Sequence, residues 1–158
     1  MSNGFTIESA RESLAQFTKY MEQRVPNPVT SILIDVNHEY TMIELRSLLQ
    51  QFSSHLATLC GIQGQVEAEY TLIKKGLKTG LDVASLSDES KSTITEKESR
   101  LIASNEEFAK WKKMEIYMEA SLIQVKSWVK SYESAVAGVS RIVTVDISES
   151  SLVTNRYT

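Results

Sequence analysis

Basic side chains gather on both sides of one polar segment in the second half of the chain. Lys74 and Lys78 are four residues apart and share a helical face, with Lys75 next to them. Basic groups clustered at one end of a helical rod neutralise phosphates and release counterions, so the binding they support weakens with salt. A solvated lysine face is the alternative interpretation. The candidate nucleic-acid contacts are Lys74, Lys75, Lys78, Lys91, Lys97 and Arg100.

A second basic group surrounds a tryptophan. Lys110 and Lys113 share a helical face, and Lys112 is next to Trp111. An aromatic ring beside basic groups can stack on unpaired bases. Trp111 and the later aromatic residues nevertheless recur at helical spacing, and aromatic residues in that pattern are more often part of a core.

Residue types that carry catalysis or bind metals are sparse. His38 and His55 have no cysteine or acidic pair at ligand spacing. The chain has no glycine-rich phosphate loop, no dinucleotide fingerprint and no nucleophile elbow. The lone Cys60 has no internal disulfide partner and lies in an apolar-periodic stretch, where a core thiol is expected. We therefore expect a binding protein rather than an enzyme, without cofactor or metal.

Composition indicates one domain in a reducing, aqueous compartment. The chain has 158 residues, of which 42% are hydrophobic. The start MSNGFTIESARES lacks the basic and apolar blocks of a secretory signal, and no apolar run approaches the roughly 20 residues of a membrane span. The net charge is −3, but residues 71–113 hold nine basic and seven acidic residues. We expect a cytoplasmic protein, in the host cytoplasm if a phage encodes it.

The first 39 residues predict a short helix and a connector. Apolar residues at 4-3-4 spacing indicate an amphipathic helix over about 7–24. Pro26 and Pro28 end it, because each removes a backbone donor and disfavours helical conformation in the preceding residue. The following SILIDV is typical of an extended connector or a short strand, and Asn37 after it is a plausible helix N-cap.

A heptad pattern then begins and predicts a long helix. Gln63 is its one polar seam position and lies between Gly61 and Gly64, where it either sets the register or marks a kink; we favour the first. A period of 3.5 residues held over five heptads is typical of a helix packed along a supercoiled seam. The seam positions are Met42, Leu45, Leu49, Phe52, Leu56, Leu59, Gln63, Val66, Tyr70, Ile73 and Leu77.

The remaining segments complete an all-α hairpin. The pattern fails over about 81–95, a serine-rich and acidic stretch that predicts a loop, and resumes from Ile94 to Val143 as a second long helix. Two long helices joined by one loop must run antiparallel, so 40–143 is expected to form a hairpin. Residues 144–158 are expected to be a polar tail, either a short strand or disordered. The hairpin carries more apolar surface than two helices cover, which favours packing of the N-terminal helix and a symmetric homo-oligomer.

Residues 67–143 carry an order of features that resembles a known family. A helix ends in the basic cluster LIKKGLK, a polar loop follows, then EKES with LIASNEE, and finally a tryptophan-containing amphipathic helix that closes with SRI. This order is similar to the UvsY family of recombination mediators from tailed phages. The resemblance implies a single-stranded DNA-binding oligomer, commonly a ring, that assists a RecA-like recombinase in displacing a single-strand binding protein.

The resemblance also implies where those functions lie. The family's DNA contacts correspond best to Lys74, Lys75 and Lys78, with the basic residues at 91, 97 and 100 as weaker candidates. This chain departs from the family in its longer N-terminal region, its acidic balance and its polar tail. The oligomer contacts would lie on the apolar stripe toward the C-terminal end, at Trp128, Val129, Tyr132, Val136 and Val139.

Two other functions fit the same patterns. A structural or adaptor coiled coil would use its apolar stripes to bind partner helices, with lysines that only solvate the surface. A phage-encoded inhibitor that docks on a host enzyme through an acidic face is a third possibility. Salt-sensitive binding to oligonucleotides separates the DNA-binding hypothesis from the adaptor hypothesis.

Overall fold

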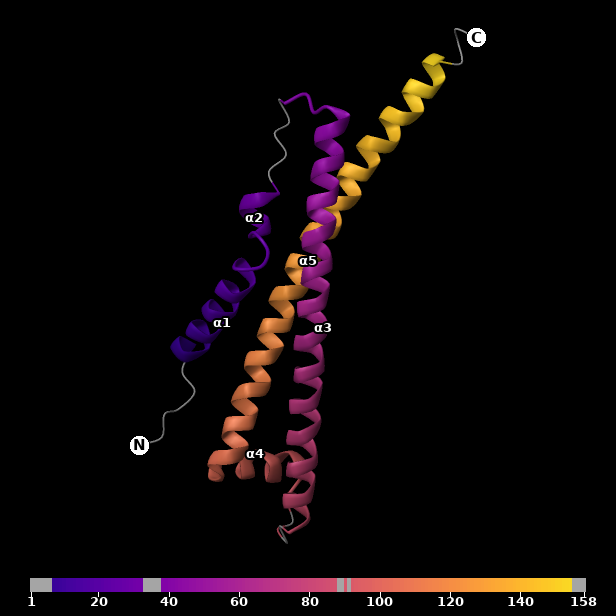
Figure 1. Cartoon of the computed structure of the whole chain (residues 1–158). Helices are drawn as coiled ribbons and strands as arrows, with labels where there is room; N and C mark the ends of the chain where they lie inside the picture. The colour runs from indigo at the N-terminus through magenta and orange to yellow at the C-terminus, as the bar shows by residue number, and fades with distance from the viewer. Residues whose placement is uncertain (1–6, 33–37, 88–89, 91, 155–158) are drawn as a thin grey trace. The chain divides into compact units, whose positions relative to one another are not determined.

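The computed structural model describes residues 7–32, 38–87, 90 and 92–154 (Figure 1). Every regular element in these ranges is a helix, and the two long helices α3 and α5 pack antiparallel. The all-α helical hairpin expected from the heptad pattern is therefore confirmed. The elements are α1 (Ile7–Glu22), α2 (Pro28–Ser31), α3 (Met42–Leu86), α4 (Ile94–Ser104) and α5 (Glu106–Thr154).

The chain divides into two compact units, and each unit contains a part of both long helices. Unit 1 consists of residues 1–19 and 63–124, and unit 2 of residues 20–62 and 125–158. All six basic residues proposed as nucleic-acid contacts fall within the ranges of unit 1. None of the helices in the described part of the chain is both long enough and apolar enough to cross a membrane.

The predicted seam of α3 is the buried face of the helix. All eleven seam positions are buried or half-buried, and Leu59 is completely inaccessible to solvent. In unit 2 the facing stripe of α5 includes Val125 and Val139, which are also 0% exposed. The 3.5-residue period places these side chains on one line, and this continuous apolar line drives the pairing of the two helices.

The glycines within α3 do not interrupt it. Helical backbone continues through Gly61 and Gly64, and a Cβ atom added at either position would meet nothing within 4 Å. Because glycine in a helix interior costs about 0.5–1 kcal/mol relative to alanine, we expect Gly61→Ala and Gly64→Ala each to stabilise the protein by about that amount. Urea unfolding followed by circular dichroism measures the change. A loss of stability in either variant would show that close packing against another molecule requires the glycine.

In unit 2 the proline-containing turn after α1 is fixed by a tyrosine of α5. The Tyr132 hydroxyl donates to the Pro26 carbonyl oxygen at 2.8 Å and shares a 3.0 Å hydrogen bond with Ser31 Oγ. Its ring is fully buried and makes edge contacts with Phe52 and His55 of α3. The turn itself forms α2, with Asn27 as N-cap and Pro28 in its first turn.

This tyrosine hydroxyl gives a measurable stability prediction. Tyr132→Phe removes the donor of this part-buried hydrogen bond while keeping the ring, so we expect a loss of about 1–2 kcal/mol in the free energy of unfolding. Tyr117→Phe on the same helix is the matched control, because the Tyr117 hydroxyl has no hydrogen bond to any described residue. Equal denaturation midpoints for the two variants would contradict the assigned role of Tyr132.

The start of α3 differs from the expectation. Thr41 supplies the capping hydrogen bonds, with its backbone N–H donating to Glu44 Oε2 at 2.7 Å and its Oγ1 accepting from the Glu44 N–H at 3.3 Å. The hydrogen bond from the Thr41 backbone is the main cause that lowers the pKa of Glu44. Asn37, expected as N-cap, and most of SILIDV lie outside the described residues; Ser31 and Ile32 end α2 instead of beginning a strand.

The second half of the hairpin also has different boundaries. Helix α3 continues to Leu86, beyond the expected loop start at 81, because this stretch contains no helix breaker and buries Leu81. The expected single helix from Ile94 is divided at Asn105, which has an extended backbone and caps α5 through a 2.8 Å hydrogen bond from the Glu107 N–H. Residues 144–154 continue α5, since they contain neither glycine nor proline, so the expected tail is mostly helical.

Candidate nucleic-acid interface

The three lysines of α3 are exposed in unit 1. Lys74 Nζ donates to Tyr70 Oη at 3.2 Å and lies 5.3 Å from the centre of the Tyr70 ring. This hydrogen bond is the main cause that raises the pKa of Lys74, and Glu115 and Glu119 raise it further. Lys75 and Lys78 form no ion pair or hydrogen bond with any other described residue. The ammonium groups of Lys75 and Lys78 therefore have no acidic partner in the described part of the chain.

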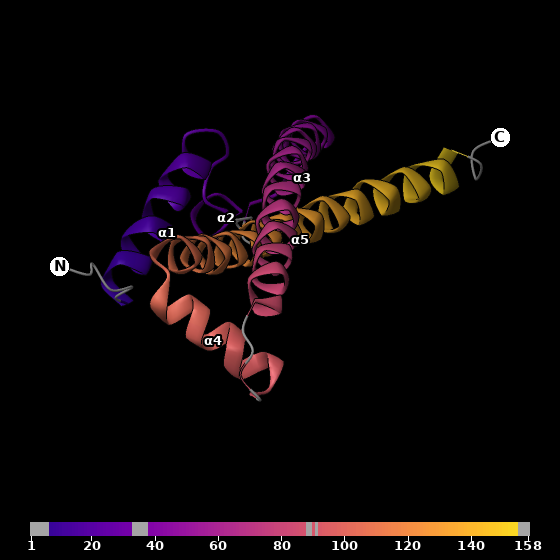
Figure 2. The same cartoon turned by 90° about the horizontal axis from the view of Figure 1, so that it is seen from below.

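The basic residues after the loop lie on α4, which joins the end of α3 to the start of α5 (Figure 2). Arg100 is exposed and donates to Ser92 Oγ, whereas Lys97 is half-buried and already has an interaction partner. Lys91 lies outside the described residues. The structure thus places Arg100 with the α3 lysines as an exposed basic group of unit 1, and it leaves Lys97 less accessible.

Helix α4 has capping hydrogen bonds at both of its ends. Thr93 and Glu96 form a capping box, and Asn105 ends the helix through a hydrogen bond from its N–H to the Leu101 carbonyl. None of the α4 side chains is buried. The T-x-x-E pattern of this capping box is visible in the sequence, and α4 starts at Ile94, where the apolar pattern was expected to resume.

Two lysines near Trp111 are paired with acidic groups of their own helix. Lys112 Nζ contacts Glu115 Oε2 at 2.7 Å, and Glu115 is largely buried. Lys110 Nζ lies 3.1 Å from Glu106 Oε1, with both groups exposed. An exposed pair contributes about 0–1 kcal/mol and opens readily, so Lys110 stays available to a ligand, whereas the buried Glu115 neutralises Lys112.

The residues expected at an oligomer interface belong to the interior of unit 2. Four of them are at most 8% exposed, and Val136 is half-buried. A side chain packed inside its own chain leaves little surface for a second copy. This burial disfavours the interface expected at Trp128, Val129, Tyr132, Val136 and Val139, which stays a prediction. The off-seam residues Ile62 and Trp128 are buried as well, in the same unit as Met21 and Val25 from the N-terminal segment.

Exposed apolar side chains remain on both units. Ile116 and Ile123, seven residues apart on one face of α5 in unit 1, are 40% and 66% exposed. On α3, Leu72 is exposed in unit 1 and Ile43 in unit 2. These residues are part of the exposed apolar surface that is open to a protein partner.

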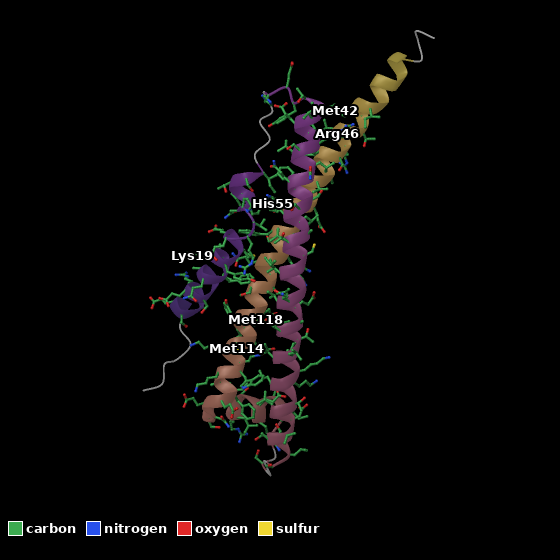
Figure 3. All side chains as sticks on the ribbon, in the orientation of Figure 1. Lys19, Met42, Arg46, His55, Met114 and Met118 are labelled. Carbon is green, nitrogen blue, oxygen red and sulfur yellow. The ribbon has the colours of Figure 1, made fainter. Side chains whose placement is uncertain are left out.

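The described residues show no cluster suited to metal binding. They contain no group of three or more histidine, cysteine, aspartate or glutamate side chains placed to hold an ion. His38 Nε2 lies 3.6 Å from Glu44 Oε1 beside the start of α3, at an exposed position. Figure 3 shows His55 on α3, where its ring contacts Tyr132. Both histidines therefore have structural neighbours.

Comparisons with protein-family models, with curated proteins and with solved structures find no match to this chain. The fold defines the class to which the chain belongs: an antiparallel helical hairpin with a short N-terminal helix. In unit 1 the exposed basic residues of α3 and α4 are Lys74, Lys75, Lys78 and Arg100.

Proposed function

We propose that this chain is a single-stranded DNA-binding recombination mediator, which assists loading of a RecA-like recombinase onto DNA covered by single-strand binding protein in the cytoplasm. The observation that carries the DNA-binding part is the exposed lysine cluster Lys74, Lys75 and Lys78, of which two have no acidic partner among the described residues. The mediator role is supported by the resemblance of residues 67–143 to the UvsY family.

Each chain offers few phosphate contacts, so tight binding requires repetition. A homo-oligomer would present the α3 lysines several times along one flexible strand, and linked weak contacts raise the overall affinity by orders of magnitude. Such an assembly binds DNA even though each subunit carries a net charge of −3. The exposed Ile116 and Ile123 of α5 are apolar surface that association of subunits would cover.

The same exposed isoleucines favour a second function. An adaptor protein would use this α5 face to bind an amphipathic helix of another protein, without contact to nucleic acid. The lysines of α3 would then only keep the surface solvated.

Fluorescence anisotropy of a labelled single-stranded oligonucleotide across a salt series separates the two functions. For the DNA-binding protein we expect binding at low salt that weakens linearly on a log–log plot, with a slope of about −0.7 for each phosphate contacted. Absence of binding at low salt, by protein that circular dichroism shows to be folded, would contradict the proposal and leave the adaptor function as the better one.

A further inference from the structure

Trp111, near the start of α5, is an exposed member of the apolar pattern of this helix. Trp111 is 41% exposed, whereas the later stripe residues Met118, Leu122 and Val125 are at most 8% exposed. Met114, one turn beyond Trp111 and labelled in Figure 3, is 54% exposed. The start of α5 in unit 1 therefore presents an aromatic ring to solvent.

A glycine of α3 holds this ring against the helix backbone. A Cβ atom on Gly76 would lie 3.1 Å from Cζ3 and 3.6 Å from Cη2 of Trp111. One turn on, a Cβ atom on Gly80 would lie 3.0 Å from Cε1 of Phe108. The two glycines are four residues apart on one face of α3 and leave room for the two rings. One edge of the Trp111 ring is thus supported by protein, while much of the remainder stays open.

Basic residues adjoin this contact in the sequence of both helices. Lys75 directly precedes Gly76 on α3, is exposed, and has no ion pair or hydrogen bond with any other described residue. Lys110 directly precedes Trp111 on α5, and its pair with Glu106 is exposed on both sides. Each of the two helices therefore carries an accessible ammonium group one residue from the contact between Gly76 and Trp111.

We propose that Trp111 is a stacking platform for an unpaired base and gives this protein a preference for single strands over duplex. The inference rests on the proposed DNA-binding function and adds a residue outside the basic cluster. A base has an exposed aromatic face only when it is unpaired and unstacked, so a fixed ring with lysines beside it selects single-stranded nucleic acid. The phosphates of the same strand contact Lys75 and Lys110.

The flanking lysines favour a nucleic acid over a protein as the ligand of this ring. An apolar partner helix would remove water from the two ammonium groups without offering them a negatively charged group. Loss of that hydration costs free energy. A strand brings its own negative charge and its own aromatic faces, and both match what the described residues present.

Abasic DNA separates stacking from charge. The affinities of oligothymidylate and of an abasic oligonucleotide of equal length are measured by anisotropy for wild type, Trp111→Ala and, as control, Met114→Ala. We expect wild type to prefer the base-containing strand by about fivefold or more, Trp111→Ala to lose that preference with unchanged binding to the abasic strand, and Met114→Ala to keep it. Equal preference in wild type and Trp111→Ala would overturn the platform, while leaving the DNA-binding function intact.

Intrinsic fluorescence gives a second readout that needs no truncation of the ring. The chain has two tryptophans, and Trp128 is only 7% exposed, so a Trp128→Phe variant reports Trp111 alone. Stacking predicts that oligothymidylate, but not the abasic strand, quenches this emission. Emission that responds only to protein concentration would overturn the inference and identify Trp111 as a protein–protein contact. Failure of wild type to bind either oligonucleotide would reject both the platform and the proposed function.

Discussion

Replacing Lys74, Lys75 and Lys78 together by alanine is expected to lower both the affinity for single-stranded DNA and its dependence on salt. Each phosphate contact to a single strand contributes about −0.7 to the slope of log affinity against log salt, so losing three contacts makes the slope less steep by about 2. The ratio of the wild-type affinity to the variant affinity should then fall about 15-fold when the salt concentration is raised from 50 to 200 mM. Anisotropy titrations at several salt concentrations measure the slope.

A charge-matched control shows whether position matters. Lys19→Ala, Lys126→Ala and Lys130→Ala combined remove the same three charges from other exposed positions, on α1 and α5. We expect this control variant to keep the wild-type slope within about half a unit, since general attraction contributes little once phosphate contacts are retained. An equal loss of affinity and of salt slope in the two triple variants would mean that binding depends only on the net charge of the protein. The α3 cluster would then not be the binding site.

The second large effect is expected at the centre of the helix pair. Leu59 is 0% exposed on the α3 seam in unit 2. Leu59→Ala removes buried methyl groups and leaves a cavity, so we expect a loss of about 2–5 kcal/mol in the free energy of unfolding. Against a typical total of about 5–15 kcal/mol, this lowers the urea midpoint strongly. Urea unfolding followed by far-ultraviolet circular dichroism measures it.

The same substitution at an exposed position of α3 is the matched control. Leu72 is 71% exposed, so Leu72→Ala should change the free energy of unfolding by less than about 0.5 kcal/mol. A large loss at Leu72 that depends on protein concentration would show that this surface is covered in an oligomer. Similar small losses at both positions would contradict the assignment of Leu59 to the core.

Long-range periodicity made the hairpin predictable, whereas its ends were not. Five heptads with one polar seam residue leave few alternatives to a packed helix, and every seam position is at least half-buried. The break at Asn105 depends on one local hydrogen-bonding pattern, in which an asparagine caps a helix that starts with Glu106 and Glu107. Free-energy differences of about a few tenths of a kcal/mol decide where a helix begins or ends. An apolar pattern averaged over many residues contains no information about such small local differences.

The sequence predicts which residues neighbour each other in the candidate nucleic-acid interface, but it does not predict which of them are exposed to solvent. The sequence identifies Lys74, Lys75 and Lys78 as neighbours on a helix, because helical geometry depends only on spacing. Which residues of the α5 stripe are covered depends on the N-terminal segment, which contributes Phe17 in unit 1 and Val25 in unit 2 to the buried set. The helical spacing indicated a core position for both Tyr132 and Trp111, but only Tyr132 is buried, whereas Trp111 is 41% exposed.

Recombinase loading tests the mediator proposal most directly. ATP hydrolysis by a RecA-like recombinase is followed on single-stranded DNA that is already covered by single-strand binding protein, which suppresses the reaction. Addition of this protein is predicted to restore hydrolysis, the charge-matched control variant to restore it equally, and the Lys74, Lys75 and Lys78 triple variant to fail. Persistent suppression in the presence of wild-type protein that binds the same DNA would contradict the mediator function.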